Sequence, residues 1–119
     1  MSFQYCLLND DLTLSFLQRA DNLMPDYITG GPSFADCSSS SALASVAYRG
    51  AKYFPETFGS NYTLKAAEIR EAVIGGVDSM GVLNPVVDPL SWNTTGVLST
   101  EGQAFALMMF AAWKDWLWL

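Results

Sequence analysis

Two segments of the chain, 41–49 and 104–113, are apolar on every face of the helix that each is predicted to form. The second runs for ten residues without a polar side chain, and the chain ends four residues after Asp115 in Trp116, Leu117, Trp118 and Leu119. A helix that has no polar face is normally enclosed by other elements. A chain of 119 residues is too short to enclose both, so we expect part of a larger helical enzyme, or a subunit that a partner completes.

Two further segments show the one-sided pattern of helices that face water. The first is expected from Asn9 or Asp10 to about Met24, where Pro25 ends it. The other is expected over 62–77, weakened near its end by a pair of glycines. Its apolar face consists of Ala66, Ile69, Val73 and Val77. Amphipathic and fully apolar helices therefore alternate along the chain.

Local signals mark where the two apolar helices begin. Asp36, followed by the serines at 38–41, can cap the first of them. Thr100 and Gln103 have the spacing of a capping box before the second. The segment 81–89 between these helices contains two prolines and predicts an extended loop with a short strand.

The alternation predicts an all-α fold of helical hairpins arranged in two layers, with the apolar helices inside. A compact four-helix bundle is the rival arrangement. Its members should each keep a solvent-facing side, and the segments 41–49 and 104–113 do not. We therefore favour the layered arrangement, with residues 1–119 as one unit.

Composition and charge exclude several classes of function. Half of the residues are hydrophobic and 15% are charged, which argues against disorder. The net charge of −6, with six Lys or Arg in total, argues against a nucleic-acid surface, because phosphate binding needs clustered positive charge. The chain contains no histidine, which removes Ser-His and Cys-His nucleophilic pairs and histidine-containing zinc sites. Carboxylate chemistry is the main kind left, and we expect neither a cofactor nor a metal.

The remaining sequence signals bear on the compartment. Cys6 and Cys37 fit no metal motif, and we favour two free thiols over a disulfide. Asn61 and Asn93 each begin an N-glycosylation pattern, which mildly supports a secretory history, although the N-terminus lacks the features of a signal peptide. The longest apolar run is well short of the roughly 20 residues that cross a bilayer, and the Trp-rich C-terminus lacks the basic residues that help membrane binding, so no membrane contact is expected.

Two sequence groups resemble a known family. The segment 36–49 reads Asp-Cys-Ser-Ser-Ser-Ser-Ala-Leu-Ala-Ser-Val-Ala-Tyr-Arg, and 99–105 reads Ser-Thr-Glu-Gly-Gln-Ala-Phe. Together with the loop at 81–89, they resemble the C-terminal part of six-hairpin glycosidases, in particular fungal proteins similar to unsaturated rhamnogalacturonyl and glucuronyl hydrolases. The resemblance spans roughly residues 21–116.

This resemblance implies a partial (α/α)6 barrel, because twelve helices need about three times this length. The family's catalytic aspartates would lie upstream, so no catalytic residue is expected in this chain. The implied parent enzyme hydrolyses unsaturated uronic-acid residues from oligosaccharides, and the fragment alone would be inactive. The alternative is a non-enzymatic helical module that self-associates through its exposed apolar helices or docks on a partner.

Four residues are candidates for substrate binding, and each has a structural alternative. The resemblance implies that Asp36 and Glu101 lie at a cleft wall, although both can simply stabilise helix starts. Trp92 can stack on a sugar ring or anchor its loop. Arg49 can pair with a substrate carboxylate or mark the solvent end of its helix. If 104–113 is an inner helix of such a barrel, it should leave one face uncovered in this chain, where the absent hairpins would pack.

Overall fold

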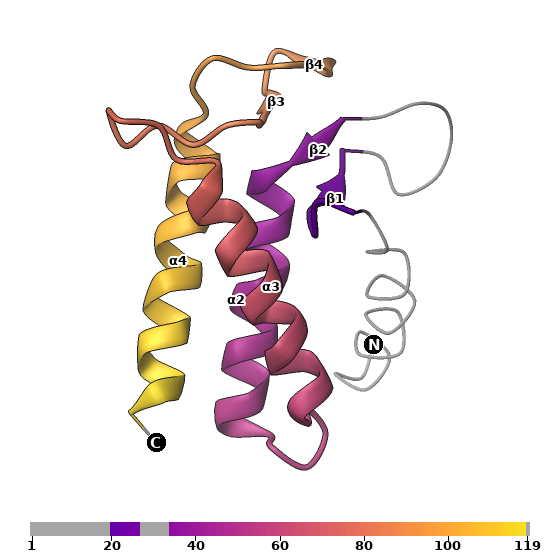
Figure 1. Cartoon of the computed structure of the whole chain (residues 1–119), viewed down its shortest axis with the longest axis vertical. Coiled ribbons are helices and arrows are strands. Elements are labelled where there is room, and N and C mark those ends of the chain that lie inside the picture. The colour runs from indigo at the N-terminus through magenta and orange to yellow at the C-terminus, as the bar shows by residue number, and fades with distance from the viewer. Residues whose placement is uncertain (1–19, 27–33, 119) are drawn as a thin grey trace.

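The computed structural model describes residues 20–26 and 34–118, which form three helices and two small antiparallel sheets (Figure 1). The helices are α2 (Cys37–Tyr53), α3 (Ser60–Gly75) and α4 (Thr100–Leu117). Strand β1 (Met24–Pro25) pairs with β2 (Ala35–Asp36), and β3 (Val87–Asp88) pairs with β4 (Ser91–Thr95). The described part of the chain is therefore a mixed α/β structure.

Helix α2 lies at the centre of the arrangement and packs against both other helices, whereas α3 and α4 scarcely touch each other. Figure 1 shows α2 and α4 running in the same direction and α3 running in the opposite one. The N-terminal ends of α2 and α4 consequently lie at the same end of the molecule, beside the β3–β4 sheet. This parallel pairing brings distant sequence segments together at a common edge.

The start of α2 agrees with the sequence prediction. Asp36 is the N-cap, and its carboxylate accepts hydrogen bonds from the backbone N–H of Ser38 at 3.2 Å and of Ser39 at 2.9 Å. These bonds satisfy two of the donors that a helix start leaves free. The helix continues to Tyr53, four residues beyond the apolar segment that predicted it. Nine of its 17 residues are buried, whereas Val46, Arg49 and Tyr53 are exposed.

Helix α3 also follows its predicted pattern. Ala66, Ile69 and Val73 are buried, and they lie on one face at spacings of three and four residues. The helix ends at Gly75, so Val77 lies beyond it and is 39% exposed, where it pairs with Leu83 in an isolated bridge. The predicted apolar face is confirmed except for its last residue.

Helix α4 begins with a cap different from the predicted one. The Ser99 hydroxyl oxygen accepts a hydrogen bond from the Gly102 N–H at 3.0 Å. Gln103 does not complete a capping box, because its side chain accepts from the Leu83 N–H at 2.7 Å and donates to the Gly81 carbonyl oxygen at 2.9 Å. Gln103 thus attaches the loop before β3 to the first turns of α4.

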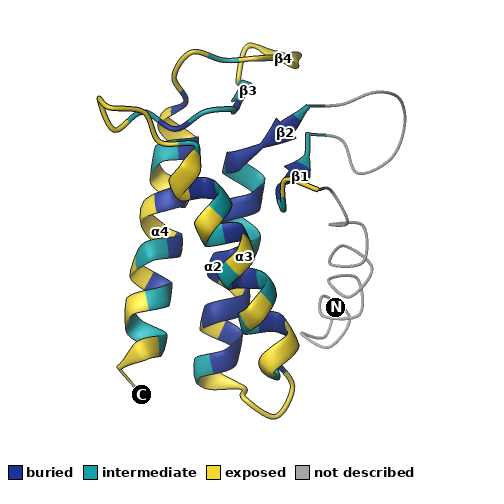
Figure 2. Ribbon diagram, in the orientation of Figure 1, coloured by how far each residue is buried: buried dark blue, intermediate teal, exposed yellow. Residues whose placement is uncertain are grey.

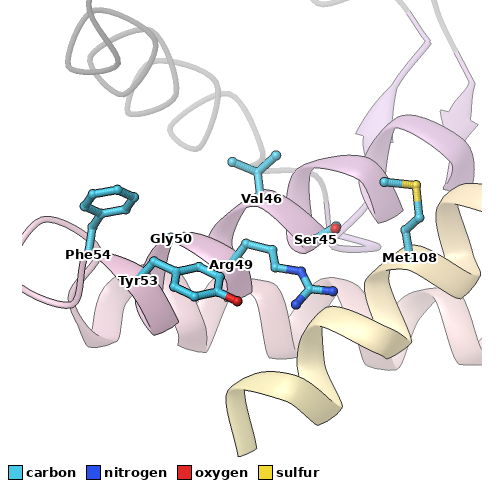
Figure 3. A pocket seen from close by; sticks show the side chains of 7 residues that line it. All are labelled: Ser45, Val46, Arg49, Gly50, Tyr53, Phe54 and Met108. Atoms are coloured by element: carbon cyan, nitrogen blue, oxygen red, sulfur yellow. The ribbon is translucent and has the colours of Figure 1, made fainter. Parts of the chain in front are cut away.

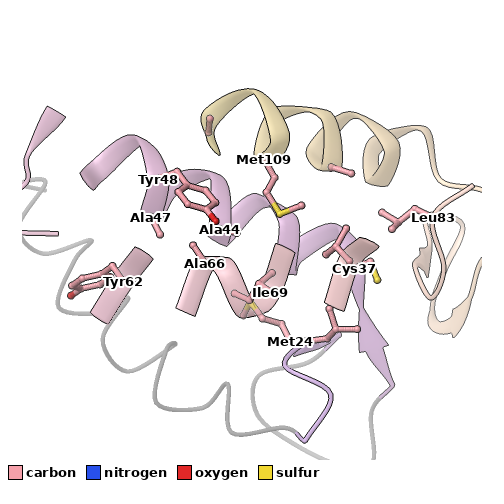
Figure 4. Close-up of a cluster of buried hydrophobic side chains, with 14 of the residues drawn as sticks. Met24, Cys37, Ala44, Ala47, Tyr48, Tyr62, Ala66, Ile69, Leu83 and Met109 are labelled. Carbon is pink, nitrogen blue, oxygen red and sulfur yellow. The ribbon is translucent and has the colours of Figure 1, made fainter. Parts of the chain in front are cut away.

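The hydrophobic core lies between the three helices, and Met24 of β1 and the segment before β3 also contribute to it (Figure 4). Small side chains let α2 approach its neighbours closely, and the larger ones fill the space between them. The largest fully buried side chains are those of Tyr48, Ile69, Leu83, Met109, Val73 and Val86.

The expected all-α fold with a partial (α/α)6 barrel is wrong. Residues 20–26 and 34–118 contain two sheets beside three helices, and no barrel is found among them. The segment before α2 and the segment between α3 and α4 contain short strands rather than helices, in part because Pro25 and Pro89 restrict the backbone and lack an N–H. With α2 as the common neighbour and α3 and α4 hardly in contact, the helices do not form a ring.

The first predicted helix falls largely on residues 9–19, which lie outside the described residues. Its predicted end is wrong, because residues 20–22 form a turn and bend in which Asn22 has φ of 60°, and Met24 belongs to β1. Among the described helices, none is both long enough and apolar enough to span a bilayer.

Candidate functional site

A small hollow, here called the helix-start pocket, lies where the N-terminal ends of α2 and α4 meet the β3–β4 sheet. Its volume is about 250 Å³. It combines the indole ring of Trp92 with hydroxyl groups and one carboxylate. The lining consists of Ser38, Val87, Pro89, Trp92, Ser99 and Glu101.

Asp36, which does not line the pocket, joins two of the elements that form it. Besides capping α2, its Oδ1 accepts a hydrogen bond from the Val87 N–H at 3.2 Å, which fastens β3 to the start of α2. The Gly96 N–H donates to the Val86 carbonyl oxygen at 2.8 Å beyond the end of β4. All five residues of β4 are exposed, and Trp92 is 71% exposed. The indole ring of Trp92 is therefore exposed to solvent, on a strand that hydrogen bonds fix in place.

Glu101 supplies the charge of the pocket. Its carboxylate accepts hydrogen bonds from the hydroxyl groups of Thr100 at 3.1 Å and Ser99 at 3.4 Å. Its own backbone N–H, followed by the Thr100 hydroxyl, holds the pKa of Glu101 below its ordinary value. The carboxylate is therefore negatively charged at neutral pH.

The structure brings together some of the predicted binding residues but not all of them. Trp92 and Glu101 both line the helix-start pocket. Asp36 lies behind it, 4% exposed, with its oxygens occupied by backbone N–H groups. Arg49 is thirteen residues further along the sequence, about 20 Å along α2 at 1.5 Å per residue. It therefore belongs to a different part of the surface.

Arg49 contributes to a contact between the C-terminal halves of α2 and α4. Its guanidinium forms an ion pair with the carboxylate of Asp115, which also contacts the Lys52 ammonium at 2.5 Å. The hydrogen bond from Lys52, followed by the charges of Lys52 and Arg49, lowers the pKa of Asp115. The negative charge of Asp115 is thus balanced by two positive side chains of α2.

A second surface feature is the exposed side of α4. Only Gly102, Ala106, Met109 and Ala112 of this helix are buried, and Figure 2 shows exposed residues along its length. Leu107 is 71% exposed and Met108 is 54% exposed. We call the exposed stripe the outer face of α4; it consists of Ala104, Leu107, Met108, Ala111, Lys114 and Trp118. The prediction that 104–113 leaves a face uncovered is confirmed.

The outer face of α4 continues into a groove beside α2. This α2–α4 groove has a volume of about 400 Å³, and in Figure 3 Met108 of α4 lies opposite the side chains of α2. Val46 is 46% exposed and Tyr53 is 60% exposed. The groove is mainly apolar, and its lining consists of Ser45, Val46, Arg49, Gly50, Tyr53, Phe54 and Met108.

The sequence predicts neither the groove nor Ser99 as the cap of α4. Val46 lies in the segment 41–49 that is expected to be buried, and Tyr53 lies beyond it, but both side chains are exposed. A signal for the outer face was present in the three- and four-residue spacing of Ala104, Leu107 and Ala111. For the groove there was no such signal, because it depends on which side of α2 receives α4.

Within residues 20–26 and 34–118, no group of three or more Cys, Asp or Glu side chains is placed to hold a metal ion. Comparison with family models, curated proteins and solved structures finds no match. The resemblance to six-hairpin glycosidases therefore stays a prediction.

Proposed function

We propose that this chain is an assembly module that buries the outer face of α4 in a protein–protein interface. The observation that carries the proposal is the exposure of Leu107 and Met108 in the middle of a helix that is free of charge from Gly102 to Trp113. Scattered exposed apolar residues are common, whereas a contiguous stripe beside an apolar groove is typical of an interaction site. Neighbouring Trp118 is 82% exposed and extends the stripe.

The magnitude of the apolar exposure indicates a weak to moderate interface. Fully burying a Leu or Met side chain contributes about 1.5–3 kcal/mol, so the exposed parts of Leu107 and Met108 contribute about 1–2 kcal/mol each. Association costs an estimated 4–15 kcal/mol in lost freedom and ordering. The two side chains alone do not offset that cost, so Trp118 and the groove must contribute as well. Binding tests therefore need protein concentrations from about 10 µM to 1 mM.

Replacing Leu107 by Asp tests this proposal. The variant places a charge in the middle of the outer face, where desolvation opposes its burial in an interface. We expect the wild-type chain to show a mass in sedimentation velocity that increases with concentration, and Leu107→Asp to remain monomeric over the same range. Circular dichroism should show the same helix content in both.

Leu64→Asp is the matched control, because Leu64 is 65% exposed on α3, away from the outer face of α4. It introduces the same substitution into a helix and should leave the association unchanged. A wild-type chain that is a well-behaved monomer at every concentration, or equal loss of association in both variants, would contradict the proposed interface.

Carbohydrate binding at the helix-start pocket is a second candidate function. It is favoured by Trp92, whose exposed ring can stack on the apolar face of a sugar, and by the hydroxyl groups and carboxylate beside it. Glu101 is the one charged side chain in the lining. Because it carries a negative charge, a neutral sugar suits the pocket better than a uronic acid, which would meet a like charge.

Titration with a galactose oligosaccharide and a galacturonic acid oligosaccharide of the same length, followed by tryptophan fluorescence, tests the second candidate. We expect the neutral ligand to bind more tightly, and Trp92→Ala to weaken binding by about threefold to tenfold through loss of stacking. Trp118→Ala is the control, because Trp118 is also exposed but lies at the other end of α4. Equal effects of the two variants would argue against this pocket.

A further inference from the structure

We propose that the α2–α4 groove binds one molecule of a medium-chain alkyl carboxylate, such as decanoate. This inference goes beyond the assembly function, because it concerns the groove and not the outer face of α4. The groove volume of about 400 Å³ lies within the range of roughly 300–1,000 Å³ that is usual for small-molecule sites. Met108 of α4 lies opposite α2, so two helices form the walls of the groove (Figure 3).

The α2 side of the groove consists of two rows of residues at four-residue spacing. The members of the first row each carry a hydroxyl or guanidinium group that can donate a hydrogen bond; they are Ser45, Arg49 and Tyr53. The second row is apolar and consists of Val46, Gly50 and Phe54. Because residues four apart are neighbours on a helix surface, the polar and the apolar row run side by side. This arrangement suits a ligand that has one polar end and an apolar body.

The hydroxyl group of Ser45 is a buried donor without a partner. The residue is 7% exposed and lines the groove. Among residues 20–26 and 34–118, its side chain forms no hydrogen bond. Buried polar groups in proteins are nearly always paired, and leaving one unpaired is unfavourable. A ligand oxygen that accepts a hydrogen bond from Ser45 therefore gains stability at this point of the groove.

Arg49 supplies the charge that an anionic head group needs. Its Nη1 pairs with Asp115, but the side chain is 44% exposed, so further N–H groups of the guanidinium are accessible. Lys52 also contacts Asp115, at 2.5 Å, so two positive side chains balance one acid. The described lining of the groove contains no acidic residue, although the whole chain has a net charge of −6. Charge complementarity therefore favours a carboxylate over a neutral or cationic head group.

The apolar row favours an alkyl chain over a sugar. Val46 is 46% exposed, and Met108 on the opposite wall is 54% exposed. The two rows extend over residues 45–54, about 14 Å along α2 at 1.5 Å per residue. An extended carbon chain advances about 1.2 Å per bond, so decanoate is about 11 Å long and fits this length. A uronic acid, which the family resemblance implies for Arg49, would instead place hydroxyl groups against apolar side chains.

Calorimetric titration of the full chain with octanoate and decanoate, each below its micelle concentration, tests the alkyl site. Each CH₂ group that leaves water strengthens binding about threefold to fourfold, so decanoate should bind about tenfold more tightly than octanoate. We expect one decanoate per chain, with a dissociation constant between about 10 µM and 1 mM. No detectable decanoate binding in this range, or several molecules per chain, would overturn the inference.

Arg49→Gln tests the contact with the carboxylate, and 1-octanol serves as the neutral ligand with the chain length of octanoate. The variant should weaken octanoate binding about tenfold and change octanol binding less than about twofold. Lys65→Gln is the matched control, because it removes one positive charge from α3, where Lys65 pairs with Glu68. It should leave both ligands unaffected. Equal weakening of octanoate and octanol by Arg49→Gln would show that Arg49 does not bind the head group.

Val46→Ser tests the apolar row and should weaken decanoate binding about threefold to tenfold. Leu64→Ser is its control, because Leu64 is 65% exposed on α3 and does not line the groove. Thermal melts establish that each variant is folded. Decanoate binding that is the same in Val46→Ser as in the wild-type chain would place the ligand elsewhere and contradict the inference.

Ligand binding and association of the chain can fail independently. If the wild-type chain associates but binds no decanoate, this inference is wrong while the assembly proposal stands. If decanoate binds equally to the wild-type chain and to Leu107→Asp, and neither protein associates, the assembly proposal is wrong while the groove stands as a ligand site.

Discussion

Asp36 is a single buried carboxylate that serves three backbone groups. It accepts from Ser38 and Ser39 at the start of α2 and from Val87 in β3, fifty-one residues away. A cap of this kind contributes about 0.5–2 kcal/mol to stability. Because the third bond joins the helix to the β3–β4 sheet, Asp36 positions the helix-start pocket without being exposed in it.

Cys37, the next residue, is fully buried, and its thiol donates a hydrogen bond to the Asn84 carbonyl oxygen at 3.4 Å. Burial first, and then the negative charges of Asp36 and Asp21, raise the pKa of the Cys37 thiol from 9.0 to about 12. A thiol held in its neutral form is a poor nucleophile. Its part in this protein is therefore to fill space at the start of α2.

This raised pKa predicts a loss of stability in alkali. The folded state holds the Cys37 proton more tightly than the unfolded state, so the associated stability is complete below pH 9.0 and is lost as the pH rises toward 12. The loss amounts to as much as about 4 kcal/mol. Urea unfolding of the wild-type chain and of Cys37→Ala across this range measures it.

We expect the free energy of unfolding to fall more steeply with pH in the wild-type chain than in Cys37→Ala, although the variant is less stable at pH 7. Parallel pH profiles for the two proteins would show that the thiol does not titrate as the structure implies. Both proteins share every ionisable group except the Cys37 thiol, so the difference between the two profiles reports on that thiol.

Helix α2 owes its central place to small residues on its packing faces. At Gly50, an added Cβ would lie 2.5 Å from the Phe58 ring, including Cγ at the base of that side chain. At Gly75, at the end of α3, an added Cβ would meet nothing within 4 Å. The two glycines thus have opposite roles, one required by close packing and the other replaceable.

These two positions form a matched pair of Gly→Ala substitutions. Gly50→Ala should lower the free energy of unfolding by about 1–3 kcal/mol, because Phe58 must move from a packed position. Gly75→Ala should raise it by about 0.4–1 kcal/mol, because alanine restricts the unfolded chain without a clash. Thermal or urea unfolding measures both, and a stabilising Gly50→Ala would indicate that Phe58 has space to retreat.

Helices α2 and α4 differ in how many other helices pack against them. Helix α2 packs against both α3 and α4, whereas α4 packs mainly against α2 alone. Arg70 of α3 adds one contact to α4, its guanidinium lying 4.1 Å from the centre of the Trp113 ring. The remaining side of α4 is the outer face, where Leu107 and Met108 are exposed, and α2 also leaves Val46 and Tyr53 exposed beside the groove.

For the molecule as a whole, this asymmetry is the basis of the assembly proposal. Among the three helices that residues 20–26 and 34–118 contain, α2 occupies the central position. A helix at the periphery normally presents polar residues to water, yet α4 presents Leu107 and Met108. A partner that covers this side would bury Leu107 and Met108.

The amino-acid sequence by itself determined the features that depend on near neighbours in the chain. Asp36 as a helix cap, the buried face of α3 and the excess of apolar surface on 104–113 all follow from spacings of three or four residues. Only the tertiary structure decided the pairing of β1 with β2, the ion pair of Arg49 with Asp115 and the side of α4 that stays open. Such contacts join segments whose mutual placement depends on the packing of all the helices together, and no local pattern encodes it.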